Sequence, residues 1–239
     1  MNTYFQFKQF IIHQDKTAMK VCTDACLLGA WVADKLENKK IIAENILDIG
    51  CGTGLLSLML AQKTEAIIDA VEINESAYLQ AKENVELCIW KEQINLFHEN
   101  IIDYKVQKKY DLIICNPPFF ENQLKSDDVH RNVAMHATQL SFNTLATCVK
   151  YNLEVNGVAA FLLPYNIVNE FSAIFKNEDL HITEQLNISH SPSHPFFRSI
   201  LLFSFSGNNK TQYSIVIKNK VNENSLEFKT LLADYYLHL

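Results

Sequence analysis

The chain of 239 residues lacks any Gly/Ser-rich or Pro-rich stretch that would divide it into domains, and it contains only 6 Gly and 5 Pro. It also lacks an apolar run long enough to span a bilayer, and residues 1–10 do not place basic residues before an apolar segment. Hydrophobic residues make up 48% of the chain, which is enough to bury one substantial core. We therefore expect a single soluble, cytoplasmic domain over residues 1–239, with a monomer as the default state.

Signals for a metal site are missing as well. The cysteines form no Cys-x-x-Cys pair, and no histidine cluster has zinc-finger spacing. Free thiols that pack as small apolar residues in a reducing compartment account for such cysteines. His190 and His194 lie four residues apart, but Pro192 and Pro195 argue against a helix that would align them as ligands. We expect no metal.

Positive charge is scarce. The formal net charge is -6, which is the wrong sign for a protein held to nucleic acid by bulk electrostatics. An RNA substrate would therefore need local contacts. The candidates are lysine clusters near the two ends of the chain, at Lys8, Lys16 and Lys20 and at Lys218 and Lys220. Taken alone, each cluster is more typical of a solvated face.

From about residue 45 onward, apolar runs of strand length alternate with longer amphipathic segments, which is the pattern of a mostly parallel sheet covered on both faces. The expected strands are 45–49, 67–72, 94–99, 110–116, 158–163, 182–188 and 200–205, and the expected helices are 24–36, 55–62, 75–87, 142–152, 167–175 and 225–236. The connection between the last two strands has no helical periodicity, so these strands should be antiparallel. The fold class is therefore α/β, with a seven-stranded, mostly parallel sheet whose last strand is antiparallel.

A glycine-rich loop, Asp48-Ile-Gly-Cys-Gly-Thr-Gly54, follows the first strand of this sheet and opens a helix. Its glycines let a ligand approach the backbone where helix N–H groups point outward. A dinucleotide fingerprint would be Gly-x-Gly-x-x-Gly, but the third glycine comes one position early and Leu55 stands in its place. The loop resembles the first motif of class I S-adenosylmethionine methyltransferases, which have a Rossmann-like fold. This resemblance implies that Gly50, Gly52 and Gly54 leave room for the amino-acid part of the cofactor, while Asp48 orders the loop and reaches the ligand directly or through water. A tight turn without a ligand is the alternative.

Two further acids follow the next strands. Glu72 ends the second strand, where a carboxylate can accept both hydroxyl protons of an adenosine ribose, although an acid at a strand end can also be simply solvated. Asp103 comes shortly after the third strand, where enzymes that carry the glycine motif contact the adenine amino group. A helix N-cap or an ordinary loop residue is the alternative for Asp103.

The sequence Asn116-Pro117-Pro118-Phe119 ends the fourth strand, at the same edge of the sheet as the glycine loop. Consecutive prolines fix the backbone direction and remove two N–H donors, which leaves carbonyl oxygens facing the pocket. The Asn116 side-chain oxygen and the Pro117 carbonyl can then accept hydrogen bonds from a conjugated –NH₂ and hold its nitrogen in line with a sulfonium methyl, so we assign Asn116 to the cofactor site as well. Phe119 would stack on the planar substrate. The irregular stretch 117–140 that follows is long enough to be functional.

Segments outside these motifs resemble one methyltransferase family in particular. They are Tyr4-Phe-Gln-Phe-Lys-Gln-Phe10, Met19-Lys-Val-Cys-Thr-Asp-Ala-Cys-Leu-Leu-Gly-Ala-Trp31, Phe197-Arg198-Ser-Ile-Leu-Leu-Phe-Ser204 and Leu226-Glu-Phe-Lys-Thr-Leu-Leu-Ala-Asp-Tyr-Tyr-Leu237. They are similar to the bacterial tRNA(Val) adenine-N(6)-methyltransferases, which modify the adenosine 3′ of the anticodon, at tRNA position 37. The resemblance covers nearly the full chain. It implies one catalytic domain without a separate RNA-binding module, with a core over 45–239 and an extension, 1–44, that packs over the cofactor site.

The resemblance also assigns residues to the cofactor and the substrate. In the family the segment that contains Thr23 and Asp24 lies over the cofactor, but here they could equally be an N-cap and a first-turn acid. His136 and Arg198 are our candidates for substrate contact, although a loop histidine and an arginine at a strand start are often only solvated. The chain departs from the family where Cys22 replaces a usual Gly and where Ala134-Met135-His136 replaces Ala-Arg-His, which removes one cation.

Three hypotheses compete. The first is methylation of adenosine 37 in tRNA(Val). The second is methylation of another planar amino group, in an rRNA base or in a protein glutamine, because the same Asn-Pro-Pro-Phe loop serves those substrates. Release-factor glutamine methyltransferases usually carry an additional N-terminal helical domain, for which the stretch before residue 45 leaves too little room. The third is a cofactor-binding module without catalysis, which would have no need of the Asn116–Phe119 loop.

Overall fold

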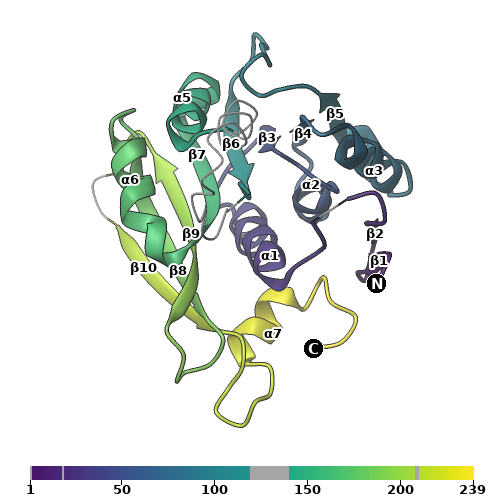
Figure 1. Ribbon diagram of the computed structural model, residues 1–239, viewed down its shortest axis with the longest axis vertical. Coiled ribbons are helices and arrows are strands. Elements are labelled where there is room, and N and C mark those ends of the chain that lie inside the picture. Colours follow the sequence, from purple (N-terminus) through teal and green to yellow (C-terminus); the bar gives the residue numbers. More distant parts are fainter. Residues whose placement is uncertain (1, 18, 119–139, 208–209) are drawn as a thin grey trace, which may run out of the picture.

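The computed structural model describes residues 2–17, 19–118, 140–207 and 210–239. Its centre is an eight-stranded sheet in the order β10-β8-β9-β7-β6-β3-β4-β5 (Figure 1). The strands are β3 (Asn45–Ile49), β4 (Ile67–Glu72), β5 (Ile94–His98), β6 (Tyr110–Cys115), β7 (Leu153–Pro164), β8 (His181–Ser189), β9 (Phe196–Ser204) and β10 (Thr211–Val216). β9 runs antiparallel to its neighbours β7 and β8, and the other neighbouring strands pair in parallel. All strands of this sheet except β9 therefore end at the same edge.

Helices cover both faces of the sheet, as the sequence predicts. They are α1 (Thr23–Glu37), α2 (Leu55–Ala61), α3 (Glu75–Glu86), α5 (Phe142–Asn152), α6 (Val168–Lys176) and α7 (Leu226–Leu232), with short 3-10 helices η1 (Lys91–Gln93) and η2 (Tyr165–Ile167). Successive strand residues face opposite layers: Ile46 belongs to the core under α1, α2, α3 and α7, whereas Leu47 belongs to the core under α5 and α6. Among the described residues, no helix is both long and apolar enough to cross a membrane.

Three of these helices begin at polar side chains that cap them. Asn74 accepts a hydrogen bond from the Ala77 amide at the start of α3 (3.0 Å). Ser141 and Ser225 do the same at the starts of α5 and α7. Such caps satisfy amides that have no partner within the helix, and each contributes about 1 kcal/mol. Local sequence therefore fixes where these helices start.

The seven expected strands are all present, and the predicted antiparallel pairing of 182–188 with 200–205 is confirmed by β8 and β9. The expected number of strands is wrong, because β10 adds an eighth. In β10 the residues from Thr211 to Ser214 are exposed and only Ile215 is buried, so the strand lacks an apolar signal. It lies at the edge of the sheet, where only β8 pairs with it. Backbone pairing rather than side-chain burial defines this strand.

The N-terminal extension forms a second, two-stranded sheet, β1 (Tyr4–Gln6) with β2 (Ile11–His13), which the sequence did not predict. Between these strands Phe7 and Phe10 are buried and stacked, with ring centroids 4.5 Å apart. The aromatic N-terminus is thus part of the core. It pairs with the C-terminal segment through an isolated bridge between Phe7 and Tyr236.

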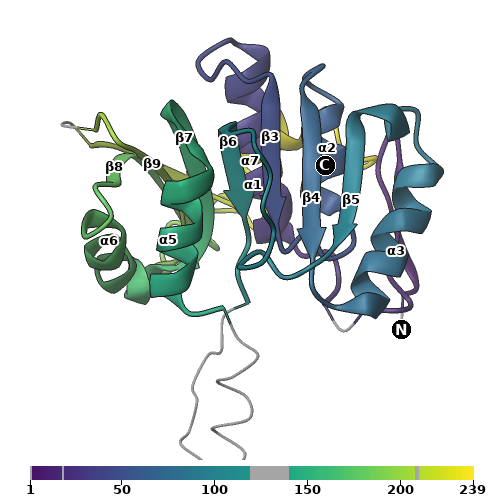
Figure 2. The ribbon, with the colours of Figure 1, turned by 90° about the horizontal axis from the view of Figure 1, so that it is seen from above.

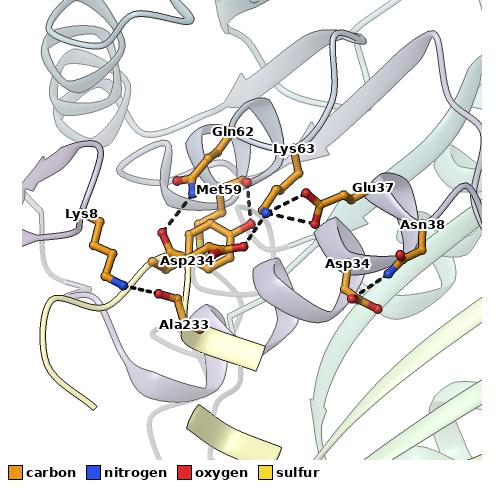
Figure 3. Close-up of polar contacts among 10 residues, drawn as sticks. Lys8, Asp34, Glu37, Asn38, Met59, Gln62, Lys63, Ala233 and Asp234 are labelled. Atoms are coloured by element: carbon orange, nitrogen blue, oxygen red, sulfur yellow. Dashed lines mark hydrogen bonds and ion pairs between the residues drawn. The ribbon is translucent and has the colours of Figure 1, made fainter. Parts of the chain in front are cut away.

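Contacts of the C-terminal segment with α2 complete this end of the molecule (Figure 3). The Lys8 ammonium donates to the Ala233 carbonyl (2.5 Å), and the Gln62 side chain donates to the Asp234 carbonyl (3.0 Å). Lys63 lies between the carboxylates of Glu37 (2.9 Å) and Asp234 (2.5 Å). The two ends of the chain are therefore tied to each other, and the C-terminal segment is also tied to the end of α2, where Lys63 reaches the last residue of α1.

Candidate functional site

The predicted motifs meet at one edge of the sheet. Ile49, the last residue of β3, is in register with Val71 of β4 and with Cys115 of β6. Glu72 is in register with His98, the last residue of β5. Figure 2 shows β4, β5 and β6 ending on the same side of the sheet. The glycine loop, Glu72, the turn after β5 and Asn116 therefore lie next to one another, as expected for ligand sites of open parallel sheets.

Gly50, Gly52 and Gly54 all have positive φ angles, of 70°, 57° and 80°. Residues with a side chain rarely adopt this conformation, so the loop needs glycine. A Cβ at Gly50 or Gly52 would meet no atom within 4 Å, whereas one at Gly54 would contact Ala81 of α3. Open space therefore lies in front of the first two glycines, where a ligand can approach the backbone.

Asp48 is fully buried directly before this loop. Its Oδ2 accepts a hydrogen bond from the Ser57 hydroxyl (2.6 Å), but its Oδ1 has no hydrogen-bond partner within the described chain. Burial raises the pKa of Asp48 to about 7, the Ser57 contacts oppose this effect and the Glu72 charge adds to it. A buried carboxylate with a free oxygen is a strong acceptor for a cationic or hydrogen-bonding ligand.

Glu72 is 8% exposed and holds the glycine loop. Its Oε2 accepts from the Gly52 amide (2.9 Å) and its Oε1 from the Asn74 amide (2.8 Å). These two backbone donors fix the orientation of the carboxylate. Each carboxylate oxygen can accept a further hydrogen bond, so Glu72 keeps the capacity to bind a pair of ligand hydroxyls.

Asp103 lies in an exposed turn beyond β5, and its amide donates to the Asn100 carbonyl (2.9 Å). Asp103 does not cap a helix. Without a cofactor it would therefore be an ordinary loop residue. Asn100 is nearer to the end of β5 and is partly buried, and its Oδ1 accepts from the Ile102 amide (3.1 Å). Position along the chain favours Asn100 over Asp103 as the residue next to the sheet edge, a possibility that sequence reasoning missed.

The turn after β5 is anchored from below by a buried polar cluster. Asp69 of β4 accepts from the hydroxyls of Tyr104 (3.0 Å) and Tyr110 (2.6 Å), from Asn95 (2.9 Å) and from Lys108 (2.8 Å). Burial raises the pKa of Asp69, but the hydrogen bonds from Lys108, Tyr110 and Asn95 outweigh this effect, so the pKa lies below its ordinary value. Because Tyr104 follows Asp103 directly, the cluster fixes the path of this turn.

Asn116 follows β6 directly and is partly buried, with Pro117 buried and Pro118 exposed after it. Two other predicted site residues, Phe119 and His136, lie outside the described residues. Asn116 lies one residue beyond the register pair of Cys115 and Ile49, which puts this residue beside the start of the glycine loop. A side-chain amide oxygen and a proline carbonyl are acceptors without charge, suited to an amino group rather than to a phosphate.

Thr23, Asp24 and Arg198 are brought together at the start of α1. The N-cap is Cys22, not Thr23, and Asp24 is the acid of the first turn. The Asp24 Oδ2 accepts from the Arg198 Nε (2.9 Å), and its Oδ1 from the Ala25 amide (3.0 Å). Arg198 is in register with Pro164, the last residue of β7, so this ion pair borders the same edge of the sheet.

The unusual Cys22 is compatible with its place. Its φ is -125° and its ψ is 153°, an extended backbone that any residue adopts, so the glycine common in similar sequences is not required here.

Sequence reasoning missed a buried pair of carboxamides on α3. The Asn84 Nδ2 donates to the Thr53 carbonyl in the glycine loop (2.9 Å) and to the His13 carbonyl (2.9 Å), and its Oδ1 accepts from the His13 amide (2.8 Å). One turn earlier, Gln80 accepts from the Lys16 amide (3.0 Å). Both side chains are about fully buried, with exposed fractions of 1% and 0%. The sequence does carry a signal for this pair, because the two polar residues stand four apart, on one face of the predicted helix.

The cysteines near the site are not reactive groups. Burial raises the pKa values of Cys51 and Cys115 well above the ordinary value, and the nearby carboxylates of Asp48 and Glu72 add to the effect. Both thiols therefore stay neutral. Within the described ranges, no group of His, Cys, Asp and Glu side chains could hold a metal ion.

Comparisons with known proteins agree on one class. The family model of the methyltransferase small domain matches residues 29–163. A tRNA1(Val) (adenine(37)-N6)-methyltransferase of Dyadobacter fermentans is 43% identical over 203 residues, 84% of this chain and 82% of the relative. The protein of the same name from Bacteroides thetaiotaomicron is 37% identical over 240 residues, 100% of this chain and 99% of the relative.

Solved structures show the same fold at low sequence identity. A predicted O-methyltransferase from Agrobacterium tumefaciens has a TM-score of 0.67 and 16% identity, with 88% of this chain and 96% of that chain covered. An S-adenosylmethionine-dependent methyltransferase from Clostridium acetobutylicum has a TM-score of 0.55 and 13% identity, with 79% and 94% covered.

Proposed function

The chain belongs to the family of tRNA1(Val) (adenine(37)-N6)-methyltransferases, and from this premise we propose that it transfers a methyl group from S-adenosylmethionine to N6 of adenine 37 in that tRNA, in the cytoplasm. The observation that carries the proposal is the meeting of Asn116 with the glycine loop and Glu72 at one sheet edge. The cofactor supplies an electrophilic methyl on a sulfonium.

The residues at this edge fit the cofactor. The free Oδ1 of Asp48 is an acceptor for the ammonium group of the amino-acid end, directly or through water, and the open space at Gly50 and Gly52 admits that end close to the backbone. Glu72 would accept the ribose hydroxyls with the lone pairs that Gly52 and Asn74 leave free. We retain Gly54, Thr23, Asp24 and Asp103 as further cofactor contacts.

For catalysis, the Asn116 side-chain oxygen and the Pro117 carbonyl would accept hydrogen bonds from the adenine amino group. This arrangement holds the nitrogen in line with the methyl group and stabilises the positive charge that develops on it during attack. The new N–C bond forms as the S–C bond breaks, and the amino proton leaves to solvent afterwards, so no base with a shifted pKa is needed. Phe119 would stack on the base, Pro118 would stiffen the loop, and His136 and Arg198 would contact the substrate.

The proposal includes a domain organisation. We propose one methyltransferase domain over 1–239, with a core at 45–239 and the extension 1–44 against the cofactor site, acting as a monomer. The hydrogen bonds of Asn84 to His13 and Thr53 support this placement, because they connect the extension to the glycine loop through one side chain of α3.

The test is methylation of total tRNA from a strain that lacks this gene, with radiolabelled S-adenosylmethionine, followed by digestion to nucleosides. We expect label in N(6)-methyladenosine beside the valine anticodon. Label absent from tRNA but present in rRNA or in a release-factor digest would instead support methylation of another planar amino group through the same loop.

A further inference from the structure

A pair of exposed aromatic rings stands beyond the catalytic edge of the sheet. Tyr165, in η2 directly after β7, is 43% exposed, and Phe196, the first residue of β9, is 37% exposed. Their ring centroids are 5.4 Å apart with an interplanar angle of 49°. Large aromatic side chains that stay exposed as a pair present π-faces to whatever binds at this edge.

The register of the strands places this pair close to Asn116. Cys115 is paired with Phe161 of β7, so Asn116 is level with the next residue of that strand. Pro164 lies two residues further along, and Tyr165 follows it. With about 3.3 Å per residue and about 4.8 Å between strands, Asn116 and Pro164 are on the order of 10 Å apart. A nucleotide next to one held at Asn116 could therefore reach the aromatic pair.

Basic and imidazole groups lie at the same edge of the sheet, after the ends of β8 and β10. The His190 ring, just after β8, stacks on Phe197 with centroids 4.0 Å apart and an interplanar angle of 9°. The His190 carbonyl accepts from the amide of Lys218, which follows β10 (2.9 Å). Lys218 is partly exposed and Lys220 is exposed. Figure 1 shows the β8–β9 connection beside the connection from β10 to α7, the same two segments that this hydrogen bond joins.

We propose that these groups form an RNA-binding rim, made of Tyr165, His190, Phe196, Phe197, Lys218 and Lys220, that receives the unpaired nucleotides and phosphates flanking the target adenine. Aromatic rings stack on splayed-out bases of single-stranded RNA with little sequence preference, and lysines neutralise phosphates. The connection 217–225 carries two lysines and one glutamate, so it is locally basic in a chain of net charge -6. The proposal rests on the proposed function and names where the RNA lies.

The first test is the double variant Tyr165→Ala/Phe196→Ala, assayed with tRNA at saturating S-adenosylmethionine. The KM for tRNA should rise about tenfold or more, because two stacking surfaces are lost, while the Kd for S-adenosylmethionine stays within twofold. The matched control is Tyr151→Ala, since Tyr151 is 73% exposed but lies near the end of α5, at the opposite edge of the sheet. Should the alanine variant fold poorly, Tyr165→Leu/Phe196→Leu keeps apolar volume and removes the π-faces.

The second test is Lys218→Glu/Lys220→Glu, measured as KM for tRNA over a series of salt concentrations. We expect a higher KM at low salt and a shallower dependence of KM on salt, because fewer counterions are released on binding. Lys176→Glu is the control, since Lys176 is exposed at the end of α6, away from this edge. If Lys176→Glu raises the KM for tRNA as much as the double variant does, net charge alone explains the effect, and the proposed rim is wrong.

The outcomes separate this proposal from the proposed function. If the wild-type protein methylates no tRNA, the proposed function fails and the rim fails with it. If the wild-type protein methylates adenine 37 and both double variants keep the wild-type KM for tRNA, only the rim is wrong. A KM for S-adenosylmethionine that rises in parallel with the KM for tRNA would show a general structural effect and would also contradict the rim.

Discussion

The cofactor side and the RNA side of this site are built differently. On the cofactor side the polar groups are buried and held by short hydrogen bonds: Asp48, Glu72 and Asn84 are 0%, 8% and 1% exposed. On the RNA side the aromatic side chains proposed to contact bases, Tyr165 and Phe196, are exposed. The glycine loop is thus organised before any ligand arrives, whereas the RNA surface contributes contacts without supporting the core. Changes on the two sides should therefore affect different quantities.

The largest difference between the effect on kcat and the effect on cofactor affinity is expected at Asn116. Asn116→Ala removes one of the two acceptors that would orient the amino group and stabilise its developing charge, so kcat should fall by about 10²–10³-fold or more. Because the buried partners of the cofactor loop stay in place, the Kd for S-adenosylmethionine should change far less. Single-turnover methyl transfer and calorimetric titration measure the two effects. Retained turnover would refute the catalytic role.

Asp48 gives the next largest effect, on cofactor affinity. Asp48→Asn removes the charge that would face the ammonium group of the cofactor, and the Kd should rise by about 10–100-fold, as expected for a lost charged hydrogen bond in a buried site. With the pKa of Asp48 at about 7, cofactor binding to the wild-type protein at pH 6 should release protons. Calorimetry in buffers of different ionisation enthalpy detects this release, and Asp48→Asn should abolish it.

The same carboxyl predicts how stability depends on pH. Its pKa in the folded protein, about 7, lies above the ordinary 3.8, so the stabilisation from the protonated form is complete below pH 4 and is lost as the pH rises towards 7. Each pKa unit corresponds to about 1.4 kcal/mol, so cofactor-free Asp48→Asn should match or exceed the wild type in stability at pH 8, by up to a few kcal/mol. Urea unfolding at pH 5 and pH 8 compares them. An identical pH dependence in both proteins would contradict the assignment.

Asn84 and Gln80 test whether the extension acts through the glycine loop. Both are buried on α3 and bind the extension, but only Asn84 also binds Thr53. Asn84→Ala and Gln80→Ala should each lower the free energy of unfolding by about 1–3 kcal/mol. The Kd for S-adenosylmethionine should rise about tenfold in Asn84→Ala and less than threefold in Gln80→Ala. If the two variants lose the same stability and show the same increase in Kd, the role of Asn84 is only structural.

The smallest effect is expected at Lys16, one of the lysines that the sequence suggested for RNA contact. Its ammonium is paired with Glu83 of α3, and both side chains are about half exposed. Such a surface pair contributes little. Lys16→Ala should change the KM for tRNA by less than twofold, and an increase comparable with that of the rim variants would extend the RNA surface to the extension.

Local patterns predicted the fold and the meeting of the motifs at one edge of the sheet. The glycine loop, Glu72 and Asn116 could be predicted because each follows a buried apolar strand, and parallel strands bring such ends together. β10 could not, because its first four residues are exposed and backbone pairing defines it. The link between Asn84 and Thr53, and the pair of Arg198 with Asp24, join positions 31 and 174 residues apart. Contacts of that kind follow from packing, which no local pattern records.

The central claim is methylation of one adenine, and a matched pair of transcripts tests it most directly. Unmodified tRNA1(Val) transcript with adenine at position 37, and the same transcript with guanine there, are incubated with the protein and labelled S-adenosylmethionine at equal concentrations. The account predicts about one methyl group per molecule of the first transcript, recovered as N(6)-methyladenosine, and background label in the second. Equal incorporation into both transcripts, or none into either, would contradict it.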